Sequence, residues 1–216
     1  MLRTLYLSPL GWPISMILNL IARVLRPFMV YGYRDKPSGK FRKFTRISST
    51  VSLGHRDKIA IGDHVWIWHH SVIDGSNSVT IGDGVQIGAW CGVFTHGSHV
   101  AIRLLGASYI GVAEKDRPGY TRAPVEIGEY TFVGTKAIIM PGAKIGKGCL
   151  ITPGSVVSGT IPDFAIAKGD PAKVVGDVRE FDKRFLRDPA LRETYFDANE
   201  VANLTSNEER GRDVNR

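Results

Sequence analysis

His96 and His99 stand three residues apart in the stretch "VFTHGSHVAIR" and are the residues best suited to move a proton. A neutral imidazole titrates near neutral pH and can act as a general base toward a hydroxyl group. His99 is the first candidate for this base and His96 the second; the alternative is a loop histidine that only forms hydrogen bonds. Asp74 comes earlier in the chain, and a carboxylate beside the imidazole would orient the ring and stabilise its charged form.

Aromatic and charged side chains around these histidines are candidates for binding a substrate. His70 lies in the stretch "WIWHHSVID", and Trp90 and Arg103 lie on either side of the histidine pair. An indole ring can stack on a sugar ring, although such rings also form subunit interfaces. Arg103 could pair with an anionic acceptor, and His70 could equally decorate a solvated turn. We predict His70, Trp90 and Arg103 as substrate-binding residues.

The elements that must position these residues repeat with a period of six. Aliphatic residues recur at this spacing, namely Ile47, Leu53, Ile61, Ile67, Ile73, Ile81, Ile87, Val93, Ile127, Val133, Ile139, Ile145, Ile151 and Val157. A helix has a period of about 3.6 residues and a strand a period of about 2, so neither accounts for this pattern. A six-residue unit fits one short strand and one turn of a parallel β-helix, in which three units make a triangular coil with the aliphatic residues inside.

The repeat stops between Thr95 and Pro124. A β-helix is a packed rod without a cleft of its own, so a site has to be made by interrupting it, and a long loop within a compact repeat is usually functional or disordered. We therefore predict an all-β fold with a parallel β-helix over residues 47–175, which an inserted loop over residues 95–124 interrupts. Residues 176–216 are predicted to form a C-terminal helix that caps the rod and a disordered tail.

Residues 1–46 are predicted to form an amphipathic helix and a basic segment. The stretch Thr4–Ala22 carries no charge, but Pro9, Gly11 and Pro13 interrupt it, so a continuous spanning helix of about 20 residues is not expected. An amphipathic helix that precedes basic residues is typical of a peripheral membrane anchor. Packing of this helix on the domain or on a partner subunit fits the pattern equally well.

The composition of the chain restricts its location and partners. It has 216 residues, a formal net charge of +7 and two cysteines, Cys91 and Cys149, at small core positions of the repeat. With few cysteines and no convincing signal peptide, a cytoplasmic location is expected, or a peripheral one at the inner face of the cytoplasmic membrane. The basic cluster between Arg34 and Arg46 lacks a recognition element for nucleic acid, so we predict no nucleic-acid partner. We also predict no metal.

The repeat and its closing motif resemble a known family. The chain is similar to the hexapeptide-repeat acyltransferases over the stretch "VEIGEYTFVGTKAIIMPGAKIGKGCLITPGSVVSGTIPDFAIAKGDPAKVV", which ends in "GDPAKVV". The similarity is greatest to the sugar O-acetyltransferases that modify galactosides, maltose or bacterial surface polysaccharides. The resemblance implies a left-handed β-helix, a homotrimer with each site between two subunits, and acetyl-CoA as the co-substrate. It also implies a histidine base in the loop, where this chain has "THGSHV".

The same resemblance implies the residues that bind acetyl-CoA. Its pantetheine arm would lie along the later coils at Gly134, Thr135 and Gly154, and Lys168 and Lys173 would lie near the nucleotide phosphates, for which lysine is a suitable partner. The chain departs from the family at the position before Gly154, where proline removes a backbone donor.

Together these observations predict an O-acetyltransferase that transfers the acetyl group directly to a sugar hydroxyl of a surface polysaccharide or of its lipid-linked precursor. One alternative is an N-acetyltransferase for a nucleotide-linked amino sugar. Another is a trimeric carbonic anhydrase, whose metal would be held by three histidines shared across subunits. A scaffold without chemistry is the remaining alternative.

Overall fold

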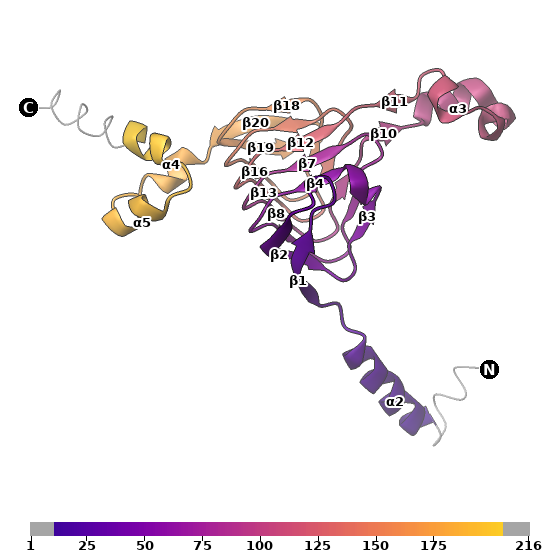
Figure 1. Ribbon diagram of the computed structural model, residues 1–216, viewed down its shortest axis with the longest axis horizontal. Helices are drawn as coiled ribbons and strands as arrows, with labels where there is room; N and C mark the ends of the chain where they lie inside the picture. The colour runs from indigo at the N-terminus through magenta and orange to yellow at the C-terminus, as the bar shows by residue number, and fades with distance from the viewer. Residues whose placement is uncertain (1–10, 205–216) are drawn as a thin grey trace, which may run out of the picture.

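The structure, a computed structural model, describes residues 11–204, and its centre is a rod of short stacked strands (Figure 1). Three sheets, here called A, B and C, form the sides of the rod. Sheet A contains, in spatial order, β1 (Met29–Arg34), β2 (Phe41–Ser48), β5 (Trp66–Ile67), β8 (Gln86–Ile87), β13 (Phe132–Val133), β16 (Leu150–Ile151), β19 (Ala165–Gly169) and β20 (Ala172–Asp177). Sheet B contains β17 (Val156–Val157), β14 (Ile138–Ile139), β9 (Gly92–Val93), β6 (Val72–Asp74) and β3 (Ser52–Gly54). Sheet C contains β18 (Thr160–Ile161), β15 (Lys144–Ile145), β12 (Val125–Ile127), β7 (Val79–Ile81) and β4 (Ile59–Ile61).

The six-residue period becomes the register of these sheets. In sheet A, Ile47 pairs with Ile67 and Ile67 pairs with Ile87; in sheet B, Ile73 pairs with Val93. The aliphatic side chains of neighbouring coils therefore stack inside the rod, where Ile67 and Ile73 are fully buried. Full burial of one such side chain stabilises the fold by about 1.5–3 kcal/mol. The predicted parallel β-helix is thus confirmed.

The corners between the sheets place one residue per turn in the left-handed backbone region. At the corner between sheets A and B these residues are His70, Trp90, Lys136 and Gly154, with φ of 60°, 55°, 62° and 72°. Glycine adopts this region readily, whereas other residues pay of order 1 kcal/mol or more. The three corner residues with side chains, His70, Trp90 and Lys136, are all exposed along this edge of the rod.

The segment before the rod is a helix and a hairpin. Helix α2 (Gly11–Val24) precedes β1, which pairs antiparallel with β2. Because β2 is also the first parallel strand of the rod, the predicted boundary at residue 47 falls inside a strand, and the basic segment forms the hairpin. Among the described residues, no helix is long and apolar enough to cross a membrane.

The inserted loop has secondary structure of its own. It leaves the rod through β10 (His96–Gly97), forms α3 (His99–Leu105) and two 3-10 turns (Gly106–Gly111 and Glu114–Asp116), and returns through β11 (Thr121–Arg122). Strands β10 and β11 pair antiparallel and hold the two ends of the loop together. Figure 1 shows α3 projecting well beyond the rod.

The segment after the rod contains short helices, α4 (Arg179–Asp182) and α5 (Pro189–Thr194), and a further helical stretch over residues 198–204. Phe196 anchors it at the corner between sheets C and A, because its ring stacks on Tyr130 with a centroid distance of 4.7 Å. The predicted disordered tail falls in residues 205–216, outside the described residues.

Candidate functional site

Asp74 and His96 lie together at the corner between sheets B and C. Asp74 is the last residue of β6, and His96 follows β9, the strand beside β6 in the next coil. The register therefore places the turn after β6 next to the point at which the inserted loop leaves the rod. The Nδ1 atom of His96 is 2.7 Å from the Oδ2 atom of Asp74. The fold thus brings together two of the three predicted catalytic residues.

Several donors surround the carboxylate of Asp74. It accepts hydrogen bonds from the backbone N–H of Ser76 at 3.0 Å and from the hydroxyl groups of Ser76 and Thr95, each at 2.9 Å. Burial alone raises the pKa of Asp74. The hydrogen bonds that the carboxylate accepts outweigh this effect and hold the pKa far below its usual range; they come from the backbone of Ser76 and from the side chains of Thr95, Ser76 and His96. Asp74 is therefore ionised at neutral pH.

An ionised Asp74 determines which nitrogen of His96 carries the hydrogen. A carboxylate only accepts hydrogen bonds, so Nδ1 is the protonated nitrogen and the neutral ring has its lone pair at Nε2. The side chain of His96 is 39% exposed and that of Asp74 is 14% exposed. The imidazole therefore links a shielded carboxylate to the solvent-facing side of the corner, which is the arrangement of a general base with its orienting acid.

The returning end of the loop covers one face of the His96 ring. His96 pairs with Arg122 in the β10–β11 ribbon, and the ring of Tyr120 lies parallel to the imidazole at a centroid distance of 5.7 Å. The guanidinium of Arg122 lies 4.5 Å from the centre of the Tyr120 ring. Burial, with a smaller effect from the charge of Glu114, raises the pKa of the Tyr120 phenol, which therefore remains neutral.

His99 and Arg103 lie elsewhere on the loop. His99 is exposed at the first residue of α3, and within residues 11–204 it forms no hydrogen bond or ion pair with a carboxylate. Arg103 is exposed in the last turn of the same helix. The structure therefore does not bring these two predicted site residues to Asp74.

The predicted donor-binding residues gather at a different corner of the rod, between sheets A and B. Gly134 and Thr135 follow β13, and Gly154 follows β16 and donates its N–H to the Thr135 carbonyl at 2.9 Å. Lys168 and Lys173 are register partners in the β19–β20 hairpin, and both are exposed.

The two predicted aromatic substrate residues lie at that same corner. The rings of His70 and Trp90 stack with a centroid distance of 5.6 Å and an interplanar angle of 18°. Trp90 is 56% exposed. Within one chain, therefore, the His96–Asp74 pair occupies one corner of the triangular rod, and the predicted donor residues, with His70 and Trp90, occupy another.

The reasoning from sequence missed Ser76, Thr95 and Tyr120. Ser76 and Thr95 could have been found from the repeat, because Ile73 and Val93 occupy equivalent positions of successive coils. The step along the chain from Ile73 to Val93 is also the step from Ser76 to His96, so Ser76 lies beside His96. Nothing in the sequence marks Tyr120, since its position depends on the path of the loop. Within the described part of the chain, no group of three or more metal-binding side chains is present.

Comparison with known proteins connects this fold to transferases. Residues 124–159 match the family model described as bacterial transferase hexapeptide (six repeats). The chain is 37% identical over 123 residues to a probable acetyltransferase of Mycobacterium tuberculosis, an alignment that covers 56% of this chain and 38% of that protein. It is 36% identical over 126 residues to a putative acetyltransferase of Saccharomyces cerevisiae, covering 57% and 58% of the two chains. It is also 28% identical to the galactoside O-acetyltransferase of Escherichia coli over 141 residues, or 64% of each chain.

The chain therefore spans less than two thirds of the length of each of these relatives. Among solved structures, a hexapeptide-repeat acetyltransferase of Vibrio cholerae is similar with a TM-score of 0.53 at 23% identity, over 61% of this chain and 69% of that one. This similarity concerns the fold. The resemblance drawn from the sequence is thus confirmed for the repeat and the fold: residues 124–159 match the hexapeptide model of bacterial transferases, and the rod is similar to the left-handed β-helix of a solved hexapeptide-repeat acetyltransferase.

Proposed function

We propose that this protein is an acetyl-CoA-dependent O-acetyltransferase that acts on a sugar hydroxyl of a surface polysaccharide or of its lipid-linked precursor. The observation that carries the proposal is the His96–Asp74 pair at the base of the inserted loop. The names of the relatives, which include acetyltransferases and a galactoside O-acetyltransferase, support the class of reaction and of acceptor.

His96 is proposed as the general base in preference to His99, because it alone of the two has a carboxylate partner among the described residues. Its Nε2 atom takes the proton of the acceptor hydroxyl while the hydroxyl oxygen attacks the thioester carbonyl carbon. Asp74 stabilises the imidazolium that forms. When the carbon–sulfur bond breaks, His96 returns the proton to the sulfur of coenzyme A. Backbone N–H groups hold the oxyanion in the tetrahedral intermediate.

Direct transfer is proposed because neither cysteine is suited to be a nucleophile. Cys91 and Cys149 are both buried in the rod, and burial raises the pKa of each thiol. A thiolate is the reactive form, so a raised pKa makes these side chains poor nucleophiles at neutral pH. The acetyl group would therefore move directly from the thioester to the acceptor, without a covalent acetyl-enzyme.

A homotrimer is proposed because one chain separates the two halves of the site. The His96–Asp74 pair and the donor residues Gly134, Thr135 and Gly154 lie at different corners of one rod. Packing of two rods side by side would bring one corner of each together, so the base of one subunit would face acetyl-CoA on its neighbour. Lys168 and Lys173 would then meet the nucleotide phosphates.

His70 and Trp90 are proposed to contact the acceptor sugar from the neighbouring subunit, and Arg103 to contact an anionic group of that acceptor. A peripheral location at the inner face of the cytoplasmic membrane, with residues 1–46 in contact with lipid, would suit a lipid-linked acceptor.

Calorimetric titration of acetyl-CoA into the purified, chelator-treated protein is the first test. We expect micromolar binding with one site per chain, which corresponds to about −8 kcal/mol. Binding would then be followed by assays of soluble galactosides and other sugars as acceptors, with the product treated with alkaline hydroxylamine. Hydroxylamine cleaves an ester but leaves an amide intact, so it separates O-acetylation from N-acetylation. A protein that binds no acetyl-CoA would overturn the proposal.

A further inference from the structure

The end of the β-helix at which the chain enters is hollowed. A pocket of about 400 Å³ lies between the β1–β2 hairpin and the first coil of the rod. Its apolar lining comes from Val30 of β1 and from the inward residues of that coil, Ile47, Val51 and Leu53. In the interior of the rod such side chains are covered by the next coil, whereas here a pocket lies over them. The open end therefore presents an apolar floor.

Two arginines lie on the rim of this pocket. Arg34 and Arg56 both line it, and within residues 11–204 neither forms an ion pair with an acid. The guanidinium of Arg56 lies 5.3 Å from the centre of the Tyr33 ring. Tyr33 also lines the pocket; it is 5% exposed, and its hydroxyl has no hydrogen-bond partner in the described chain. An unpaired buried hydroxyl is costly, and an acceptor oxygen on a ligand would satisfy it.

We propose that this pocket binds an anionic lipid, with the lipid phosphate between Arg34 and Arg56 and the start of the lipid chain on the apolar floor. Guanidinium groups match phosphate oxygens in geometry and charge, and Val51 and Leu53 offer the surface on which a hydrocarbon chain is removed from water. The inference does not depend on acetyl transfer, because the pocket shares no residue with the His96–Asp74 site.

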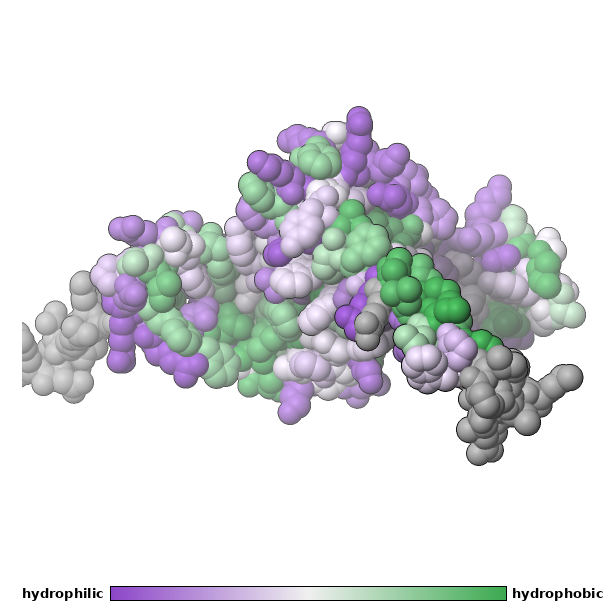
Figure 2. All heavy atoms as spheres, turned by 90° about the horizontal axis from the view of Figure 1, so that it is seen from below, coloured by the Kyte–Doolittle hydropathy of each residue, from purple (hydrophilic) through white to green (hydrophobic). Residues whose placement is uncertain are grey.

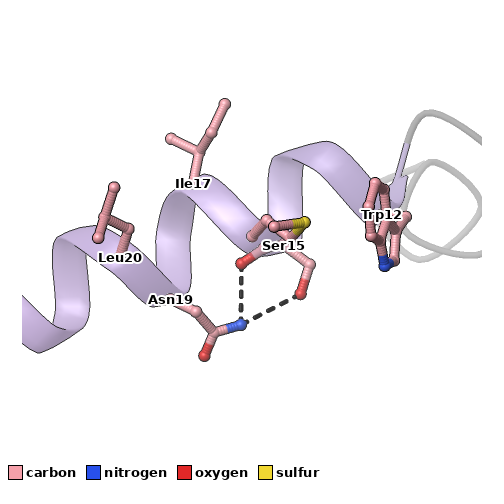
Figure 3. Close-up of a pocket in the computed structure, with 6 residues that line it drawn as sticks. Trp12, Ser15, Ile17, Asn19 and Leu20 are labelled. Carbon is pink, nitrogen blue, oxygen red and sulfur yellow. Dashed lines mark hydrogen bonds between the residues drawn. The ribbon is translucent and has the colours of Figure 1, made fainter.

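The apolar surface of helix α2 favours a lipid over a soluble anion as the ligand of the pocket. The helix leads directly into β1, which lines the pocket, and Figure 2 shows it as an apolar ridge. Its exposed apolar side chains are Trp12, Met16, Ile17, Leu18, Leu20, Ile21 and Val24. Of its polar side chains, Asn19 donates to the Ser15 carbonyl at 2.8 Å, and Figure 3 shows these two residues on the side of the helix opposite Ile17 and Leu20. A helix apolar around most of its circumference needs an apolar environment.

The charge of the hairpin favours a lipid surface that is negative. The exposed basic side chains of the hairpin are Arg34, Lys36, Lys40 and Lys43. The acid among them, Asp35, is buried and accepts hydrogen bonds from Ser38 and from the Ile61 N–H. Each basic residue near an anionic membrane contributes about 1 kcal/mol of attraction. The helix, the pocket and the hairpin therefore all fit the same occupant.

The test measures binding of the full-length protein to vesicles by co-sedimentation. The vesicles contain phosphatidylcholine alone or phosphatidylcholine with phosphatidylglycerol. We expect binding only to the anionic vesicles. The double change Arg34→Gln and Arg56→Gln should weaken this binding about 10-fold or more, which corresponds to at least about 1.4 kcal/mol.

The matched control changes Arg184→Gln and Arg187→Gln, which removes the same charge from two exposed arginines of the C-terminal segment. This control should change binding less than 2-fold, on the reasoning that distant charges are screened.

A second variant distinguishes binding in the pocket from general electrostatic attraction to the anionic membrane. Val51→Trp fills the floor of the pocket without altering any charge, and it should weaken vesicle binding by a similar factor while acetyl-CoA binding and the melting temperature stay unchanged. Equal effects of the rim and control pairs, or full binding by Val51→Trp, would overturn the pocket as the site. Release of the protein from vesicles by millimolar inorganic phosphate, together with calorimetric binding of phosphate alone, would show that the pocket binds a soluble anion. This result would overturn the assignment of a lipid as the ligand.

Discussion

The Nδ1 atom of His96 lies 2.7 Å from the Oδ2 atom of Asp74, although the two residues are 22 positions apart in the chain. The distance follows from the coil, because one turn of the rod returns the backbone to the same corner one strand further along. His99, three residues beyond His96, already lies on the exposed helix α3. The geometry therefore distinguishes two histidines that the sequence places almost together.

Replacement of each histidine tests this distinction. His96→Ala should lower kcat by about 10²–10⁴-fold, the usual contribution of a general base, while the Kd for acetyl-CoA changes less than about 2-fold. His99→Ala is the matched control, and its kcat should stay within a few-fold of the parent. Turnover of each variant with a saturating acceptor is the measurement. The reverse ranking would assign the base to His99 and remove the basis for the proposed role of Asp74.

Asp74→Asn tests the positioning role of the carboxylate. The amide keeps the size of the side chain but removes the negative charge that favours the imidazolium of His96. We expect a lower kcat with little change in the Kd for acetyl-CoA, because the imidazolium that forms on His96 during transfer loses its counter-charge. A purely structural role would lower the amount of folded protein without lowering the kcat of the folded fraction. An unchanged kcat of the folded protein would therefore contradict the assignment.

Asp74 should also make the stability of the protein sensitive to acid. Its pKa is lower in the folded than in the unfolded chain, so its stabilising effect is fully present above the unfolded value of about 3.9 and is lost as the pH falls toward the folded value. The free energy of unfolding of the parent should decrease through this window more steeply than that of Asp74→Asn. Asp57→Asn, at an exposed position of the turn Arg56–Lys58, is the control and should leave the slope unchanged.

The spacing of the coils makes some glycines indispensable. A Cβ on Gly128 would lie 2.5 Å from the backbone of the next coil, at Gly146 and Lys147. Because that neighbour is backbone, it cannot move aside, and Gly128→Ala should destabilise the protein by about 1–3 kcal/mol or more. Gly54→Ala is the control, since its nearest neighbour is the Ile73 carbonyl oxygen at 3.9 Å. Thermal unfolding of both variants is the measurement, and equal melting temperatures would show that the coils can separate locally.

Much of the fold could be predicted from the sequence because the rod is built from local repeats. Each aliphatic residue, such as Ile73 or Val93, pairs with its equivalent in the next coil, so the six-residue period already contains the register. The interruption after Thr95 was visible for the same reason. The predicted boundary at residue 47 falls inside β2, because this strand belongs both to the hairpin and to the first coil.

The sequence by itself determined the coil, its inward residues and the place of the loop, since these depend on spacing along the chain. Only the tertiary structure decided which histidine meets Asp74, because that depends on where the backbone leaves the rod and begins helix α3. It also separated the His96 corner from the corner of Gly134 and Thr135. The choice of histidine depends on the path of the backbone beyond the last strand before the loop, and a period of six residues does not contain that path.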